Sequence, residues 1–300
     1  MATIEKRSEI LFCYDVTDAN PNGDPMDENK PRIDEETKIN IVTDVRLKRT
    51  IRDYLFEYKG YNGQNGKDIF VREIFIDNDP TKGIQDGKTR AKDYGNDPNN
   101  VLNECIDIRL FGGVIPLDKD SITFTGPVQF KMGRSLHKVE LKHIKGTGAF
   151  ASKAGSKQAT FREEYILPYS FICFHGIINE AAAKHTKLTE EDINELMDAI
   201  WNGTKNLISR SKFGQMPRFL LKVTYKEKGF FIGDLDKKIK LTDYENEFSI
   251  RSPKDFKLDI SELIKIFDEN GKRIEKIEYK IDKNLNITPK IPSNWEQLNI

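Results

Sequence analysis

Apolar residues recur at helical spacing between residues 43 and 58. They occupy positions 47, 51, 54, 55 and 58, which lie on one side of an α-helix. Thr43 stands just before them and is a residue type that caps helix N-termini. The pattern predicts an amphipathic helix beginning after Thr43. A second helix is predicted over 190–207, because Thr189 and Asp192 resemble a capping box.

Strands are predicted where β-branched and aromatic residues cluster between turn-forming residues. The predicted strands are 9–16, 68–76, 121–132, 163–178 and two within 217–235, the last two separated by the hairpin sequence KEKG. Segment 163–178 is almost continuously apolar, which is typical of a central strand covered on both faces. A short helix is predicted at 259–267.

The order of these elements is strand, helix, strand, strand, helix, strand. This order predicts an α+β fold, a ferredoxin-like or RRM-like antiparallel sheet backed by two helices. We expect residues 1–300 to form a single domain with long insertions at 77–107 and 133–162. Segment 77–100 is polar and rich in Gly, Pro and Asn, which predicts an irregular insertion. The elaboration at 235–300 is charged and is expected to be a solvated shell of strands and turns.

Composition limits the classes of function. The 48 basic and 48 acidic residues cancel, so an argument for nucleic-acid binding must rest on local charge. The three cysteines are isolated in sequence, which argues against a disulfide framework and a structural zinc site. No apolar stretch is long enough for a signal peptide or a membrane helix. We therefore expect a cytoplasmic protein with no membrane association.

Positive charge is concentrated in three segments. Lys48, Arg49 and Arg52 share one face of the first predicted helix. Residues 199–226 contain six Lys or Arg and no acidic residue, and residues 131–162 contain eight against one Glu. Each segment alone is consistent with ordinary solvated side chains. Together, in a neutral chain, they predict a groove that binds a nucleic-acid backbone.

The sequence KGTGAFASKAGSK at 145–157 has small residues where a packed element would carry large apolar ones. We expect it to be flexible and to become ordered on a polyanion or a neighbouring subunit. Phe150 is its one aromatic residue and is available to stack on a base. The alternative is a solvated linker without a role.

Other chemistry is weakly indicated. KGFFIG at 228–233 resembles the RNA-binding octapeptide of RNA-recognition domains, but a Phe replaces the expected small residue, so hairpin packing is favoured. The histidines and cysteines show no metal-ligand spacing and no nucleotide-binding motif occurs, so no metal or cofactor is predicted. Asp15, Asp18 and Asp24 near the first turn could serve a nuclease, although loop carboxylates more often bind the turn backbone.

Several segments, in order, resemble the major backbone subunit of type I CRISPR surveillance complexes, within the RAMP superfamily and closest to its type I-B branch. They are YDVTDANPNGDP (14–25), VTDVRLKRTIRDY (42–54), DIRLFGG (107–113), TGPVQF (125–130), YILPYSFICFHGIIN (165–179) and SRSKFGQMPR (209–218). The resemblance covers about residues 8–230.

The resemblance implies a non-enzymatic protein that polymerises along CRISPR RNA and presents the guide for pairing with target DNA in antiviral defence. It implies a palm with a finger-like insertion at 77–107 and a thumb-like insertion at 133–162 that reaches the next subunit. The partners implied are CRISPR RNA, target DNA, neighbouring copies in a head-to-tail helical filament and other Cascade subunits. The acidic 77–107 segment is expected to face basic parts of the next copy.

Apart from Arg32, the residues expected to bind RNA come from the predicted helix and its cap, the thumb-like insertion and the basic segment after it. They are Arg32, Thr43, Arg46, Lys48, Arg49, Arg52, Lys142, Lys145, Phe150, Lys153, Lys157, Arg210 and Lys212. Two alternatives remain. One is an RNA-guided endoribonuclease that uses a first-loop Asp, and the other is a single-stranded RNA-binding protein that does not assemble.

Overall fold

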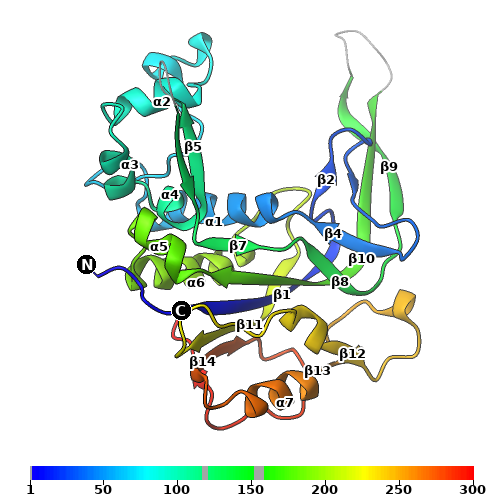
Figure 1. Cartoon of the computed structure of the whole chain (residues 1–300). Helices are drawn as coiled ribbons and strands as arrows, with labels where there is room; N and C mark the ends of the chain where they lie inside the picture. The colour runs from blue at the N-terminus through cyan, green and yellow to red at the C-terminus, as the bar shows by residue number, and fades with distance from the viewer. Residues whose placement is uncertain (1, 117–120, 152–158) are drawn as a thin grey trace.

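A computed structural model describes residues 2–116, 121–151 and 159–300. The chain is a mixed α+β protein built on a large, mainly antiparallel sheet (Figure 1). In the described part, the order of this sheet is β16-β14-β11-β1-β10-β8-β4, and β7 and β9 also pair with β10. Its strands are β1 (Ser8–Ala19), β4 (Ile39–Val42), β7 (Val128–Phe130), β8 (Gly133–Lys138), β9 (Lys142–Ala151), β10 (Ala159–Ile178), β11 (Gln215–Tyr225), β14 (Ile274–Ile281) and β16 (Glu296–Gln297).

Strand β1 lies at the centre of the sheet, between β10 and β11. Cys13 is opposite Cys173 of β10, and Phe12 is opposite Leu220 of β11. Both faces of β1 are buried, since Ile10 and Phe12 enter one apolar core while Leu11 enters another. The strands predicted at 9–16 and 163–178 are confirmed, as is the central position predicted for the second.

Two helices cover one face of the sheet (Figure 1). Helix α1 (Asp44–Lys59) buries Leu47, Ile51 and Leu55, and α6 (Glu190–Lys205) packs beside it. Thr43 caps α1 by accepting a hydrogen bond from the backbone N–H of Arg46, and α6 begins with the capping box predicted from the sequence. Both helix predictions are confirmed.

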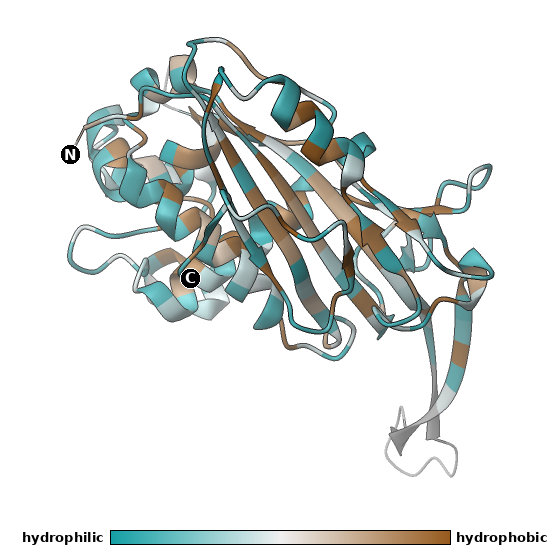
Figure 2. Cartoon of the chain, turned by 90° about the horizontal axis from the view of Figure 1, so that it is seen from below, coloured by the Kyte–Doolittle hydropathy of each residue, from teal (hydrophilic) through white to brown (hydrophobic). Residues whose placement is uncertain are grey.

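The C-terminal region covers the opposite face. It consists of η3 (Leu235–Lys238), β12 (Lys240–Thr242), η4 (Glu247–Ser249), β13 (Lys257–Asp259), α7 (Ser261–Glu269) and β15 (Ile287–Thr288). Phe256, Leu258, Leu263 and Phe267 are buried against the sheet, and hydrophobic stretches run along the strands (Figure 2). The helix predicted at 259–267 is confirmed. The expectation of a solvated shell is wrong, because isolated apolar residues in a charged sequence converge on one core.

Two predicted strands do not form. The backbone at 68–76 is irregular, and the N–H groups of Phe70 and Val71 donate to the carboxylate of Asp107 at 2.7 and 3.1 Å instead of to a strand. After β11, no hairpin strand follows. The backbone N–H groups of Ile232 and Gly233 donate to the fully buried carboxylate of Glu9. Side-chain acceptors have replaced strand pairing in both segments.

The segment predicted as one strand at 121–132 is divided between two sheets. β6 (Ser121–Thr125) pairs with β5 (Gly112–Pro116), whereas β7 joins the large sheet. Gly126 separates them at a close backbone approach, where a Cβ atom would lie 2.0 Å from the carbonyl carbon of Phe111. The chain therefore changes sheets at the one residue type that fits there.

The 77–107 insertion has more regular structure than its composition predicts. It contains η1 (Ile76–Asn78), η2 (Pro80–Lys82), α2 (Gly87–Asp93), α3 (Pro98–Glu104) and α4 (Ile106–Phe111). Ala91, Tyr94, Val101, Leu102 and Cys105 contribute to a separate small core there. The segment 77–100 expected to be irregular thus includes two short helices, each capped by an Asp side chain.

The 133–162 insertion also differs from expectation. β8 belongs to the large sheet, and a Cβ atom at Gly133 would meet the ring of Phe174 at 2.4 Å. The projecting part is an arm formed by β9 and the first half of β10 (Figure 1).

The remaining elements are α5 (Glu180–Thr186) and the small hairpin of β2 (Gly23–Asp24) and β3 (Lys30–Pro31). No helix among the described residues could cross a membrane.

Candidate nucleic-acid interface

Three segments meet where β1 ends: the 20–22 turn, the start of α1 and the 206–214 loop between α6 and β11. Asn22 joins the first two, because its Oδ1 accepts from both the backbone N–H and the hydroxyl of Thr43, each at 2.9 Å. The loop is fixed to β1 by backbone hydrogen bonds from Asn20 to Ser211 at 2.9 Å and from Thr17 to Gly214 at 3.2 Å. The geometry of this junction is therefore set by β1.

Two predicted cations, Arg46 and Lys212, lie together at this junction. Nη2 of Arg46 donates to Thr50 Oγ1 at 3.2 Å, while its Nε is buried without a hydrogen-bond partner among the described residues. Lys212 Nζ donates to the carbonyl oxygen of Asn20 at 2.5 Å. Within the described ranges, neither cation has a carboxylate within ion-pair distance.

This environment disfavours the charged forms of both groups. Burial lowers the pKa of the Arg46 guanidinium. Burial, together with the positive charge of Arg46, lowers the pKa of Lys212 to about 8. The side chains of Asn20 and Gln215 are also buried and have polar atoms without partners in the described structure. The two neighbouring cations and the unsatisfied donors Arg46 Nε and Gln215 Nε2 form a site that a bound anion would stabilise, whereas the free acceptor Asn20 Oδ1 does not contribute to it.

Other residues of the predicted basic face lie elsewhere on α1. Positions 46 and 48 are about 200° apart around a helix. Lys48 Nζ contacts Asp44 and Gln129, each at 3.0 Å, and Arg52 Nε contacts the fully buried Asp107 at 2.8 Å. Lys48 and Arg52 both lie over the ring of Phe111. The structure therefore does not bring them together with Arg46.

Arg49 is more accessible than Lys48 and Arg52. Its side chain is 44% exposed and forms an ion pair with Asp53 at 2.7 Å. An exposed pair of this kind leaves the guanidinium able to exchange partners. Of the three cations predicted to share a helix face, Arg49 is the one that remains free to reach a ligand in solvent.

Arg32 fixes the turn that carries Asn22. Its Nη1 donates to the carbonyl oxygens of Asn22 and Gly23 at 3.3 and 2.6 Å, and its Nη2 lies 3.4 Å from Asp24. Arg32 also lines an open cleft of about 590 Å³ beside the base of the arm, with Lys38, Leu141 and Phe248 among its other walls. Its first role is to hold the 22–24 backbone.

The arm contributes exposed cations. Lys142 lies 3.0 Å from Glu140 and Lys145 lies 3.3 Å from Glu163. Arg210 of the 206–214 loop contacts Glu164 at the base of the arm at 2.8 Å. Phe150 belongs to β9, but its side chain lies outside the described part, and Lys153 and Lys157 lie wholly outside the described residues.

The aspartates of the nuclease alternative occupy three different environments. Asp15 is fully buried and accepts from Arg218 Nε at 2.8 Å and Tyr169 OH at 2.9 Å, and burial raises its pKa. Asp24 bonds the turn backbone at Met26, whereas Asp18 is exposed in a left-handed conformation. Among the described residues, no group of three or more potential ligands could hold a metal ion.

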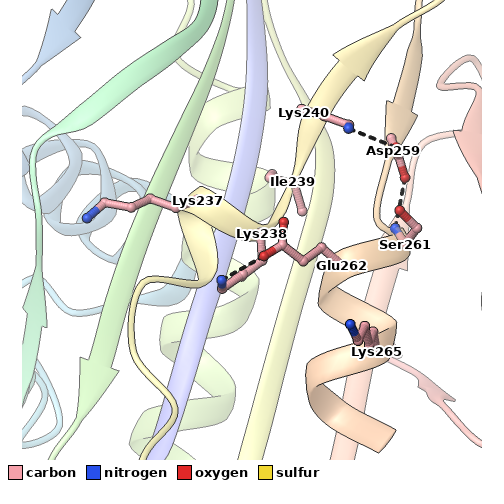
Figure 3. A pocket seen from close by; sticks show the side chains of 8 residues that line it. All are labelled: Lys237, Lys238, Ile239, Lys240, Asp259, Ser261, Glu262 and Lys265. Atoms are coloured by element: carbon pink, nitrogen blue, oxygen red, sulfur yellow. Dashed lines mark hydrogen bonds and ion pairs between the residues drawn. The ribbon is translucent and has the colours of Figure 1, made fainter. Parts of the chain in front are cut away.

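A lysine-rich cleft lies in the C-terminal region, with a volume of about 280 Å³ (Figure 3). Its charges are largely paired internally. Lys238 lies 2.7 Å from Glu262, and Lys240 lies 3.8 Å from Asp259. This cleft therefore differs from the junction, where neither Arg46 nor Lys212 has a carboxylate of the described residues within ion-pair distance.

Comparison with known proteins identifies the family. The family model described as CRISPR-associated protein Cas7 matches residues 6–261. The chain belongs to this Cas7 family. A protein named CRISPR-associated protein Cas7 from Haloferax volcanii is 32% identical over 313 aligned residues, which cover 95% of this chain and 89% of that protein. The family resemblance noted in the sequence is confirmed.

Solved structures support the same fold for this Cas7-family chain. A chain of a CRISPR RNA-guided surveillance complex in a pre-nicking state matches with a TM-score of 0.59 and 10% identity, covering 97% of this chain and 96% of that one. Another CRISPR RNA-guided surveillance complex matches with a TM-score of 0.57 and 11% identity, covering 98% and 95%.

Apart from Thr43, the residues predicted from the sequence of this Cas7-family chain do not include the uncharged part of the site. Asn20, Asn22 and Gln215 belong to that part, and both asparagines stand in a segment that carries the family resemblance. Their roles depend on contacts between segments about 20 and 190 residues apart, such as Asn22 with Thr43 and Asn20 with Lys212. Turn chemistry alone explains these asparagines in the sequence, so nothing local distinguishes them.

Proposed function

We propose that this Cas7-family chain is a non-catalytic backbone subunit that binds CRISPR RNA through its phosphates. It polymerises head to tail along the guide with neighbouring copies and other Cascade subunits, in the cytoplasm, as part of a type I-B-like complex. The assembled guide pairs with target DNA in antiviral defence. Base pairing supplies the sequence specificity in this arrangement, while the protein holds the backbone.

The observation that carries the proposal is the pair of cations at the β1 junction. Arg46 and Lys212 are partly desolvated and lie near enough to interact electrostatically, and among the described residues neither has a carboxylate within ion-pair distance, although Asp53 acts on Arg46 from further away. A phosphate oxygen would supply the missing negative charge and accept hydrogen bonds from both. Thr43 and Asn22 keep Arg46 at this position through the helix cap.

The fold is consistent with the proposed palm. The strand order β11-β1-β10-β8, with α1 and α6 on one face, corresponds to the 4-1-3-2 order of a ferredoxin-like sheet once the insertions are removed. We assign the arm of β9 and β10 as the thumb and the 77–107 insertion as the finger. The C-terminal elaboration then supports the face of the palm away from the RNA.

The predicted RNA-binding residues take different roles in this proposal. Arg46, Lys212 and Thr43 form the phosphate site, and Arg49 is an exposed neighbour. Arg32, Lys48 and Arg52 act through the positions of the turn and the helix. The RNA contacts of the arm are assigned to Lys142, Lys145, Phe150, Lys153 and Lys157, and Arg210 links the loop to the arm.

The test measures how RNA affinity depends on salt. Full-length protein freed of nucleic acid is titrated with single-stranded RNA at several salt concentrations. For a single strand, each phosphate that the protein neutralises adds about 0.7 to the steepness of log affinity against log salt. The double variant R46Q/K212Q is expected to flatten this slope. The control K254Q/K272Q removes two exposed lysines and the same net charge. Equal effects of the two double variants would rule out the junction as the phosphate site.

The non-catalytic part of the proposal is tested separately. Assembled protein is incubated with magnesium and labelled RNA complementary to the guide, and the RNA is expected to stay intact. Regularly spaced cuts that disappear in D18A or D24A would instead establish the endoribonuclease alternative.

A further inference from the structure

The 206–214 loop carries two large apolar side chains in solvent. Ile208 is 67% exposed and Phe213 is 68% exposed. Single exposed apolar residues are common and need no explanation on their own. These two stand out because they lie on the same loop as Lys212, which with Arg46 forms the proposed phosphate site.

The backbone that carries Phe213 is held in place from both sides. The N–H groups of Lys212 and Phe213 donate to the carbonyl oxygen of Ser209 at 3.1 and 2.8 Å. Gly214 has a φ of +106°, and a Cβ atom there would lie 2.6 Å from the carbonyl oxygen of Thr17. The ring is thus presented to solvent on a fixed backbone.

The ring of Phe213 is free for a new contact. Among the described residues it takes part in no aromatic pair and lies under no cation, in contrast to Phe111, which is covered by Lys48 and Arg52. It is an aromatic face one residue from Lys212, which has no carboxylate within ion-pair distance among the described residues.

We propose that Phe213 is a base-stacking residue, which binds the nucleobase next to the phosphate held by Arg46 and Lys212. This inference rests on the proposed function and adds the feature that the phosphate site lacks, a contact to bases. Sites for single-stranded nucleic acid combine cations along the backbone with aromatic rings under the bases. Every base has a π-face, so the contact is independent of sequence, as a subunit that holds many different guides requires.

A protein partner is the other candidate occupant of this surface. The chemistry favours a nucleotide, because the two apolar side chains are set among Lys205, Arg210 and Lys212 and residues 199–226 contain no acidic residue. A strand that places phosphates on these cations brings its bases to the same loop. Ile208 is almost equally exposed but has no π-face, which makes it the matched control.

The experiment compares two oligonucleotides of equal length and equal phosphate number, one with bases and one abasic, bound to full-length protein free of nucleic acid. F213A is expected to bind the base-bearing RNA roughly 5- to 100-fold more weakly, the range found for stacked aromatic residues. It should bind the abasic strand as the unmodified protein does. F213Y should retain the affinity, F213L should behave as F213A, and I208A should change neither affinity.

Three outcomes would overturn the inference while the phosphate site stands, as judged by the R46Q/K212Q slope. The first is equal weakening of both oligonucleotides by F213A, which would indicate a distorted loop. The second is no weakening at all. The third is a result that indicates an apolar contact of Phe213 with protein. Either unmodified-protein affinity in F213L, or loss of self-association in F213A with RNA affinity retained, would be such a result. If R46Q/K212Q leaves the slope unchanged, the proposed function fails together with the inference.

Discussion

The side-chain oxygen of Asn22 accepts two hydrogen bonds from Thr43, one from the backbone N–H and one from the hydroxyl. The same hydroxyl oxygen accepts from the backbone N–H of Arg46. A turn residue therefore orients the helix cap that precedes Arg46 of the proposed phosphate site. If that proposal holds, the contacts from Asn22 to Arg46 link loop conformation to ligand binding.

We expect N22A to weaken RNA binding without removing a charge. The substitution leaves two donors of Thr43 without their acceptor, which should cost about 1 kcal/mol of unfolding free energy. Arg46 should then be less well positioned, so affinity should fall while the slope of affinity against salt changes little. Denaturant unfolding and RNA titration check both parts. Wild-type affinity in a destabilised N22A protein would show that the cap does not position Arg46.

The lowered pKa of Lys212 predicts a pH dependence of RNA binding. As pH rises through about 8, the free protein loses the Lys212 proton and with it one charged contact. Affinity should therefore fall between pH 7 and 9. K212R stays charged over this range, so its affinity should remain nearly constant. Parallel curves for the two proteins would contradict the prediction.

The same pKa predicts the opposite trend for the stability of free protein. A lysine whose pKa is lower in the folded state binds fewer protons there than in the unfolded state between about pH 8 and its ordinary value. Below pH 8 both states are protonated and the cost of the buried charge is fully present. The contribution of Lys212 to the unfolding free energy should rise with pH above 8 and be absent in K212Q. Unfolding curves of both proteins at several pH values provide the measurement.

We expect substitutions of Arg52 and Arg49 to have different effects on the unfolding free energy. R52A leaves the fully buried Asp107 with only backbone partners, so we expect a loss of about 2–3 kcal/mol of unfolding free energy. R49A removes an exposed pair with Asp53 and should change stability by about 0.5 kcal/mol or less. Chemical denaturation measures both. If R52A were as stable as the unmodified protein but bound RNA more weakly, Arg52 would be an RNA-binding residue and not a structural one.

The arm is expected to serve assembly and to be dispensable for folding of the sheet. Replacing 146–157 by a short Gly-Ser linker leaves β8 and the sheet-paired half of β10 intact. Size-exclusion chromatography of the protein co-expressed with its RNA should show loss of long particles, while the free protein keeps its thermal unfolding temperature. Full-length particles with unchanged periodic accessibility of the bases to chemical probes would exclude the arm as the thumb.

Local patterns are sufficient for the elements that carry their own signals. The capped helix after Thr43 and the largely buried strand at 163–178 are specified by residues within each segment. The strand expected at 68–76 fails because Asp107, more than 30 residues later, binds its backbone. The C-terminal core is not predicted for a related reason. Phe256 and Phe267 are scattered in a charged sequence and come together only in the tertiary structure.

The candidate site is predictable in composition but not in grouping. Helical spacing predicts that Lys48 and Arg52 share a face with Arg49, and the helix does have that face. The spacing contains no information that Asp44 and Asp107 neutralise two of the three. Arg46 and Lys212 lie near each other because the α6–β11 loop returns to the end of β1. This contact is long-range, and local sequence spacing does not predict it.

Strand β1 contributes alternate residues to the cores on both faces of the sheet, Phe12 to one and Leu11 to the other. The two faces therefore cannot loosen independently, since a shift of this strand moves the lining of each. Asn20 directly follows this strand and anchors the loop of Lys212. A packing defect on the C-terminal face would thus shift β1. Because Asn20 follows β1, that shift would also displace Lys212 in the proposed phosphate site.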